Sequence, residues 1–161
     1  MAGTLAQPLR LDTRRGREMR DHTERSFGYA PIYATEPEKA VRFVVHGEPM
    51  SKARARVTKG GTAYTPKATV AAERNVLAAY QALETDTFFT GNVGVEFRFF
   101  AGTRIRRDVD NLVKLVLDAI NGHAFEDDRQ IQVMGAVRYY TDKEKARTEV
   151  HLFEVGDLNE A

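Results

Sequence analysis

The strongest constraint on the fold of this chain is an amphipathic segment that lies between two stretches of alternating apolar residues. Between Asp108 and Ile120, apolar residues recur three or four positions apart, and Gly122 follows as a stop signal. This spacing predicts a helix with one buried face. Apolar residues alternate before it over 93–99 and after it over 131–139, which is the period of a strand. The centre of the chain therefore predicts two strands joined by a helix that packs on their sheet.

Further elements flank this central unit. A β-branched and aromatic run over 41–45 predicts a first strand, 66–83 has helical spacing, and 148–155 predicts a last strand. Residues 50–65 form a basic loop with two glycines at its middle, which predicts an open hairpin or flap. Gly135, inside the third main strand, is a candidate bulge. The order β-α-β-α-β-β predicts an α/β (α+β) fold, a single domain with one mixed β-sheet and helices packed on it.

The length and composition limit the class of protein. The chain has 161 residues, enough for one domain with its own core, which we expect to span 40–155. Residues 1–39 are highly charged without a sustained period, so we expect a mobile or loosely docked arm, and 156–161 a short tail. The absence of cysteine excludes disulfides and thiolate metal sites. With no apolar run of membrane-spanning length and no signal-peptide core, we expect a cytoplasmic protein without a membrane partner.

Acidic residues gather at both ends of the predicted central helix. Asp108 and Asp110 stand two positions apart at its start, where an extended segment turns both side chains to the same side. Asp110, Lys114 and Asp118 follow at helical spacing and share one helix face. A second cluster over 126–128 comes just before the third main strand. We expect the two clusters to meet in space, where several close carboxylates require a cation.

The donor types suggest which cation such a site would take. Hard oxygen ligands, without cysteine and without a histidine cluster, favour Mg²⁺ or Mn²⁺ over zinc. Each acid also has a structural interpretation: Asp108 can cap the helix, Asp110 suits the macrodipole, and 127–128 suit a turn. For a single acid we favour the structural interpretation. The combination, with Asn111 beside the pair and two arginines directly before it, favours a functional site.

Ten positive charges lie in two segments, although the net charge is +1. The first segment, 52–74, contains one acid, and the second, 98–107, contains none. Such patches beside an acidic pocket suit a polyanion whose phosphates run over them, although a basic run alone is explained equally well as a solvated loop. The residues that we expect to contact DNA are Lys52, Arg54, Arg56, Lys59, Lys67, Arg104, Arg106 and Arg107.

The acidic motif resembles a known family. Three stretches, 108–114, 117–119 and 127–128, resemble the signature of the RusA family of Holliday junction resolvases, and 49–56 and 64–66 resemble its N-terminal segment. The resemblance covers roughly 41–155. It implies an α/β fold of its own type, a homodimer, and a Mg²⁺-dependent endonuclease, with Mn²⁺ as a substitute, that nicks four-way DNA junctions symmetrically in recombination and repair. It also implies phage or prophage encoding, and hence the host cytoplasm.

The same resemblance implies roles for individual residues. The implied catalytic residues are Asp108, Asp110, Asp128 and Lys114; the metal ligands are Asp108, Asp110, Asp127 and Asp128; Asn111 and Asp118 are further site candidates. Lys114 matches the family's essential lysine and would neutralise charge that develops on the phosphate in the transition state.

Three other functions stay open at this point. The first is a non-catalytic protein that binds branched DNA, and the second is a metal-dependent nucleotide-linked transferase that uses the Asp-x-Asp pair. The third is a small interaction protein in which every acid is a cap or a turn residue. The intact set of acids argues against the first of these, and the basic segments and the lack of a nucleotide-binding loop argue against the second.

Overall fold

The computed structural model describes residues 37–156, and the account below concerns these residues. The predicted arm and tail lie outside them except at their inner ends. In chain order the elements are β1 (Ala40–His46), β2 (Arg56–Val57), β3 (Ala63–Tyr64), α1 (Lys67–Gln81), β4 (Val93–Ala101), α2 (Val109–Ile120), the 3₁₀ turn η2 (Asp128–Gln130), β5 (Ile131–Tyr140), the 3₁₀ turn η3 (Lys143–Lys145) and β6 (Arg147–Glu154).

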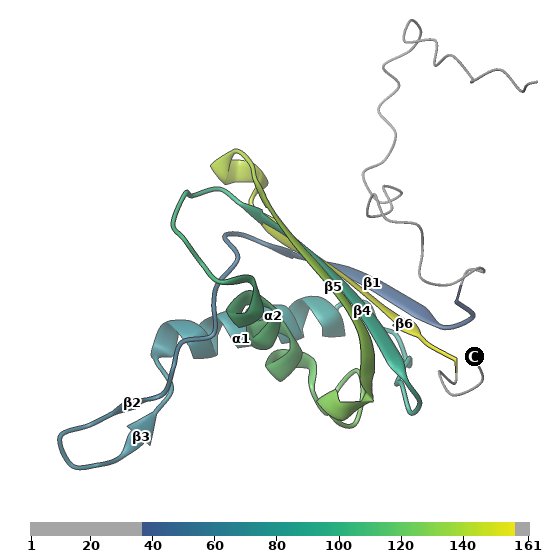
Figure 1. Ribbon diagram of the computed structural model, residues 1–161, viewed down its shortest axis with the longest axis horizontal. Coiled ribbons are helices and arrows are strands. Elements are labelled where there is room, and N and C mark those ends of the chain that lie inside the picture. The colour runs from purple at the N-terminus through teal and green to yellow at the C-terminus, as the bar shows by residue number, and fades with distance from the viewer. Residues whose placement is uncertain (1–36, 157–161) are drawn as a thin grey trace, which may run out of the picture. The chain divides into compact units, whose positions relative to one another are not determined.

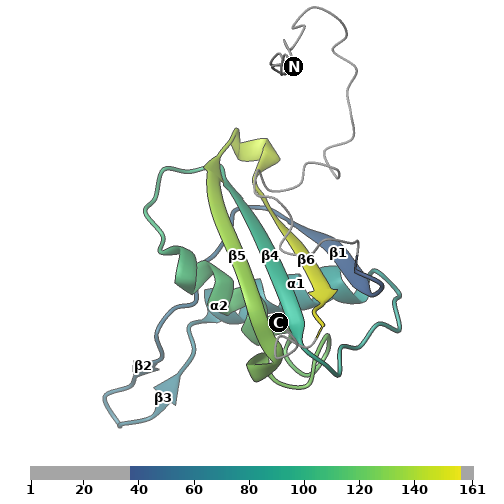
Figure 2. The ribbon, with the colours of Figure 1, turned by 45° about the vertical axis from the view of Figure 1, so that its right-hand side comes forward.

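The main sheet is mixed, as the sequence predicts. Its strand order is β1-β6-β4-β5, with β4 and β5 parallel and the other neighbours antiparallel. Both α1 and α2 cover the same face of this sheet (Figures 1 and 2). The predicted order β-α-β-α-β-β is therefore confirmed for a single α+β domain, and the predicted flap adds the short strands β2 and β3.

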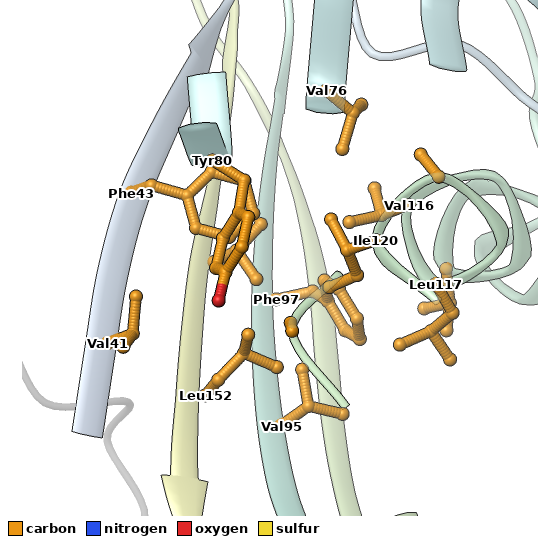
Figure 3. Packing of buried hydrophobic residues seen from close by; sticks show 14 of the residues in the cluster. Val41, Phe43, Val76, Tyr80, Val95, Phe97, Val116, Leu117, Ile120 and Leu152 are labelled. Carbon is orange, nitrogen blue, oxygen red and sulfur yellow. The ribbon is translucent and has the colours of Figure 1, made fainter. Parts of the chain in front are cut away.

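The core lies between the sheet and the two helices. On β4, the residues with strand period, among them Val95 and Phe97, are fully buried. The apolar stripe of α2 packs against them, and Figure 3 shows Val116 and Ile120 facing the side chains of the sheet. Because both elements are held by this core, the chain that joins them has fixed ends.

The β2–β3 hairpin extends from the helices (Figure 1). Arg56 pairs with Tyr64 and Val57 with Ala63, and Gly61 turns the tip with a φ of +83°. Both strands of the hairpin are exposed along their length. This element matches the predicted open hairpin, and its two basic residues, Arg56 and Lys59, are exposed.

One detail of the strand prediction is wrong. Gly135 pairs with Glu96 in regular register, and the irregularity lies instead between Val93 and Gly94. Gly94 is buried because the Phe153 ring covers it: a Cβ there would lie 2.1 Å from that ring. A glycine inside a strand thus marks a close side-chain approach here. Among the described residues, no helix is both long enough and apolar enough to cross a membrane.

Candidate active site

Asp108 and Asp110 lie at the start of α2. Asp108 occupies the N-cap position, but its side chain makes no capping hydrogen bond; only its backbone carbonyl accepts, from the Leu112 amide at 3.1 Å. Both carboxylates are exposed, and neither forms a hydrogen bond or ion pair with residues 37–156. A helix cap therefore does not account for Asp108, and both carboxylates are open to a ligand.

Lys114 and Asp118 share a face of α2, as their spacing predicts. The Lys114 ammonium is 3.4 Å from Asp118 Oδ1, and the lysine side chain is 60% exposed. The other oxygen of Asp118 lies 2.9 Å from the ammonium of Lys52. Asp118 therefore bridges two lysines, and most of the Lys114 side chain remains exposed to solvent.

Lys52 has a structural role that its sequence context did not reveal. Its ammonium binds Glu73 of α1 as well as Asp118 of α2, and its backbone amide donates to the Asn111 carbonyl at 2.8 Å. Burial alone would lower the pKa of Lys52, but the bonds to Glu73 and Asp118 outweigh it and raise that pKa. Lys52 thus ties the start of the basic loop to both helices.

The second acidic cluster contains one bound carboxylate and one open one. Asp127 caps η2, where its Oδ1 accepts from the Arg129 amide at 2.9 Å. The Gln130 side chain accepts from the amides of Glu126 and Asp127 and donates to the carbonyls of two residues before β4. Asp128 is exposed and makes no such bond with the described part of the chain. The structural interpretation therefore holds for Asp127 but does not explain Asp128.

Helix α2 separates the two clusters. Its 12 residues give a length of about 18 Å at about 1.5 Å per residue. Asp108 precedes the first turn, whereas Asp128 follows the last turn beside the start of β5. Within residues 37–156 of one chain, no three His, Cys, Asp or Glu side chains lie close enough to hold a metal ion. The expectation that the clusters meet therefore fails within one chain, because the whole helix lies between them (Figure 2).

The basic residues fall into two groups. Arg107 is committed to an ion pair with Glu48 at 2.8 Å, and Lys52 to the pairs described above. The other predicted DNA contacts are exposed and form no ion pair with residues of the described domain: Arg54, Arg56, Lys59, Lys67, Arg104 and Arg106. No acid lies between Glu48 and Glu73, so the hairpin region is purely basic. Its exposed charges suit a polyanion.

Open carboxylates close to exposed basic residues are typical of an enzyme that acts on the phosphates of nucleic acid. The family comparison gives this class a name. Residues 46–152 match the model of the family described as endodeoxyribonuclease RusA. This match covers well over half of the chain, which therefore belongs to the RusA endodeoxyribonuclease family, as the motif predicts. Among curated proteins, no significant match is found.

Proposed function

We propose that this protein is a metal-dependent endodeoxyribonuclease that resolves four-way DNA junctions by paired symmetric nicks in recombination and repair. The observation that carries the proposal is the pair of exposed, unbonded carboxylates of Asp108 and Asp110 in a RusA-family chain. They directly follow one basic segment, and the Lys52 amide joins the other to the start of α2. We also propose that it acts in the cytoplasm, that of the host if the gene belongs to a phage.

The open carboxylates fit a hard divalent cation in their chemistry. Mg²⁺ is usually held by one or two carboxylates together with waters and substrate phosphates, so a cage of protein ligands is not required in the free chain. Asp108, Asp110 and Asp128 would hold it, and Asp127 would add the oxygen that its cap leaves open. Mn²⁺, with similar ligand preferences, would substitute. When bound, such an ion stabilises charge on the attacking water and on the phosphate oxygens.

Lys114 would act on the phosphate from the same helix face. Its ammonium is exposed, and its contact with Asp118 is long, so little is lost when it turns toward DNA. In the transition state, negative charge grows on the phosphate oxygens and a nearby ammonium stabilises it. Asn111, on the first turns of α2, is held through its carbonyl by Lys52 and would orient groups beside the acids.

A homodimer accounts for the separation of the acids. Asp128 lies one helix length from Asp108 in the same chain. A two-fold related copy can place its own Asp128 beside the Asp108 and Asp110 of its partner, and by symmetry the reverse. Two equivalent sites would then serve the two strands of a four-way junction, whose own symmetry is close to two-fold. The hairpin and the arginines before α2 would hold the duplex arms by their phosphates, which gives affinity without sequence preference.

A cleavage assay tests this proposal. The purified protein is incubated with a labelled four-way junction or a matched linear duplex, in Mg²⁺ or in EDTA. Asp110→Asn is compared with Asp86→Asn, which changes an exposed aspartate of the loop before β4. We expect paired nicks in opposite arms that require Mg²⁺ and are lost only in Asp110→Asn. Tight junction binding without nicks under any divalent metal would instead indicate a non-catalytic binder. If the protein neither binds nor nicks the junction, the nucleotide-linked transferase becomes the favoured function.

A further inference from the structure

The segment that leads into α2 needs an external support. This entry loop, residues 102–107, joins β4 to α2 and ends directly before Asp108 (Figure 1). It has no regular secondary structure, and 104–106 are exposed. Without a backbone ladder, the conformation of a loop depends on the side chains that bind it. The position of Asp108 therefore depends on what holds the entry loop.

One carboxylate binds both ends of the entry loop. Glu48, which follows β1, accepts the Gly102 amide on Oε2 at 2.8 Å. Its Oε1 accepts from the Thr103 hydroxyl at 2.6 Å and from the Arg107 guanidinium at 2.8 Å. The side chains of Glu48 and Arg107 are 23% and 15% exposed. This ion pair is thus better shielded from solvent than a surface pair. Through these bonds Glu48 links the first residues of the entry loop to its last residue.

Glu48 and the start of the loop are themselves held by the backbone. The Gly47 amide donates to the Ala146 carbonyl at 2.9 Å, which fixes the chain directly before Glu48. At Gly102, a Cβ would lie 2.6 Å from the Cα of Lys143 and 3.3 Å from Glu48 Oε2. Only glycine lets the loop approach this closely. The contact between Glu48 and the loop is therefore built into the backbone on both sides.

The end of the loop is also held from β5. The Arg138 guanidinium donates to the Arg107 carbonyl and lies 5.4 Å from the centre of the Tyr140 ring. The Arg104 guanidinium lies 5.5 Å from the same ring. Arg107 is thus fixed through its side chain by Glu48 and through its carbonyl by Arg138, and the next residue is Asp108.

We propose that Glu48 is a positioning residue of the nuclease site, which holds the entry loop in the conformation that presents Asp108 and Asp110 to the scissile phosphate. This inference rests on the proposed nuclease function. In this role Glu48 acts through the entry loop, since its carboxylate bonds to Gly102, Thr103 and Arg107. It also fixes the charge of Arg107 on the loop, while Arg104 and Arg106 remain exposed to phosphates.

The kinetic test compares Glu48→Gln with Glu149→Gln. Glu149 also binds an arginine, Arg147, at 2.7 Å and is 20% exposed, but its partners lie outside the entry loop. Glu48→Gln is expected to lower kcat for junction cleavage about 10- to 100-fold, the cost of a small misplacement of reacting groups. Junction binding in EDTA should be no weaker, since a negative charge has been removed. Thr103→Val should lower kcat less, in the same direction.

Two kinetic outcomes would overturn the proposal. One is a wild-type kcat in Glu48→Gln. The other is an equal fall in Glu149→Gln, which would indicate a general effect of losing an arginine ion pair.

A second readout does not depend on cleavage. In hydrogen–deuterium exchange, the Gly102 amide should be protected in the wild-type protein and exchange about tenfold faster in Glu48→Ala but not in Glu149→Ala. Equal exchange at Gly102 in wild type and Glu48→Ala would contradict the inference whatever the enzyme does. If the wild-type protein cleaves no junction, the proposed function fails, and this measurement still decides whether Glu48 holds the loop.

Discussion

The two ends of helix α2 hold the residues beside their open carboxylates with different kinds of contact. At each end the fold binds one residue tightly and leaves its neighbour open: Arg107 is bound and Asp108 is open, Asp127 is bound and Asp128 is open. At the N-terminal end the binding groups are charged, chiefly Glu48 of a distant loop. At the C-terminal end they are the cap of Asp127 and the neutral side chain of Gln130, which bonds to the backbone before β4.

This difference has a physical consequence. An ion pair that organises a loop depends on the protonation of its carboxylate, whereas amide-to-backbone bonds do not. The contacts of Glu48 should therefore respond to pH and those of the Gln130 side chain should not, while an exposed carboxylate at each end remains available for chemistry.

The largest expected effect tests whether the two ends serve one site. Asp128→Asn should lower kcat for junction cleavage about 10³-fold, as strongly as Asp110→Asn, because each removes charge from the same reacting centre. Asp127→Asn should lower kcat less than Asp128→Asn, because one oxygen of Asp127 is occupied by its cap and only the other is open to the ion. The measurement is single-turnover cleavage at saturating protein. An inactive Asp127→Asn beside an active Asp128→Asn would reverse the assignment of the two neighbours.

A smaller fall is expected along the helix face between the two ends. Lys114→Gln should lower kcat about 10²-fold, the typical cost of losing one charge-stabilising group in a transition state. Asp118→Asn should cost less, because it only removes the long contact to Lys114 and one of two partners of Lys52. The rates are compared with junction affinity measured in EDTA. A Lys114→Gln enzyme that binds junctions weakly but turns over normally would make Lys114 a binding residue instead.

The pH dependence of stability separates the contacts of Glu48 from those of Gln130. Burial alone would raise the pKa of Glu48, but hydrogen bonds from Thr103 and Gly102 and the charge of Arg107 hold it below the ordinary 4.5. The contribution of the ionised Glu48 carboxylate to the free energy of unfolding is thus complete above pH 4.5. It is lost as the pH falls through the lowered pKa. Glu48→Gln should be about 2 kcal/mol less stable than wild type at pH 7, and the gap should narrow below pH 4.5.

The matched variant at the other end is Gln130→Ala. Its destabilisation should be the same at pH 7 and pH 4, because no titrating group of the described residues bonds to the Gln130 side chain. Urea unfolding at both pH values measures the difference in free energy of unfolding between the wild type and each variant. A constant gap for Glu48→Gln would show that its carboxylate does not organise the N-terminal end.

The smallest effect concerns the hairpin, which Lys52 ties to the N-terminal end of α2. Lys59→Gln should weaken junction binding a few-fold and reduce the slope of log affinity against log salt by about 0.9, as expected for one phosphate contact. Lys145→Gln is the control, since this exposed lysine is paired with Asp142 next to β6. Equal slopes in both variants would remove the hairpin from the DNA-binding surface.

Much of the fold follows from local patterns. The strand period over 93–99 and the apolar stripe of 108–120 predict β4 and α2 because each pattern reports a face that packs on the core. Paired glycines in a basic loop predict the hairpin for a similarly local reason. The bulge predicted at Gly135 is absent, and the register shift lies beside Gly94, which the Phe153 ring covers. A glycine in a strand pattern does not by itself tell a bulge from a close side-chain approach.

The candidate site is less predictable. Sequence spacing identifies the acids but places Asp108 and Asp128 together, although a complete helix separates them. Contacts such as that of Glu48 with Arg107 join residues 59 positions apart, and local periodicity carries no information at that range. The sequence signal for these contacts is compositional. Glu48 and Glu73 lie at the two ends of a basic stretch that contains no other acid. Each forms an ion pair with a basic residue that was predicted to contact DNA.

The most direct test of the central claim, that acids from both ends of α2 form one site across two copies, is a mixing experiment. Asp110→Asn and Asp128→Asn proteins are each assayed alone and then after unfolding and refolding together. A shared site predicts two inactive proteins whose mixture recovers Mg²⁺-dependent nicking at about a quarter of the sites, because each mixed dimer contains one intact pair of acids. A mixture as inactive as its parents would contradict the claim.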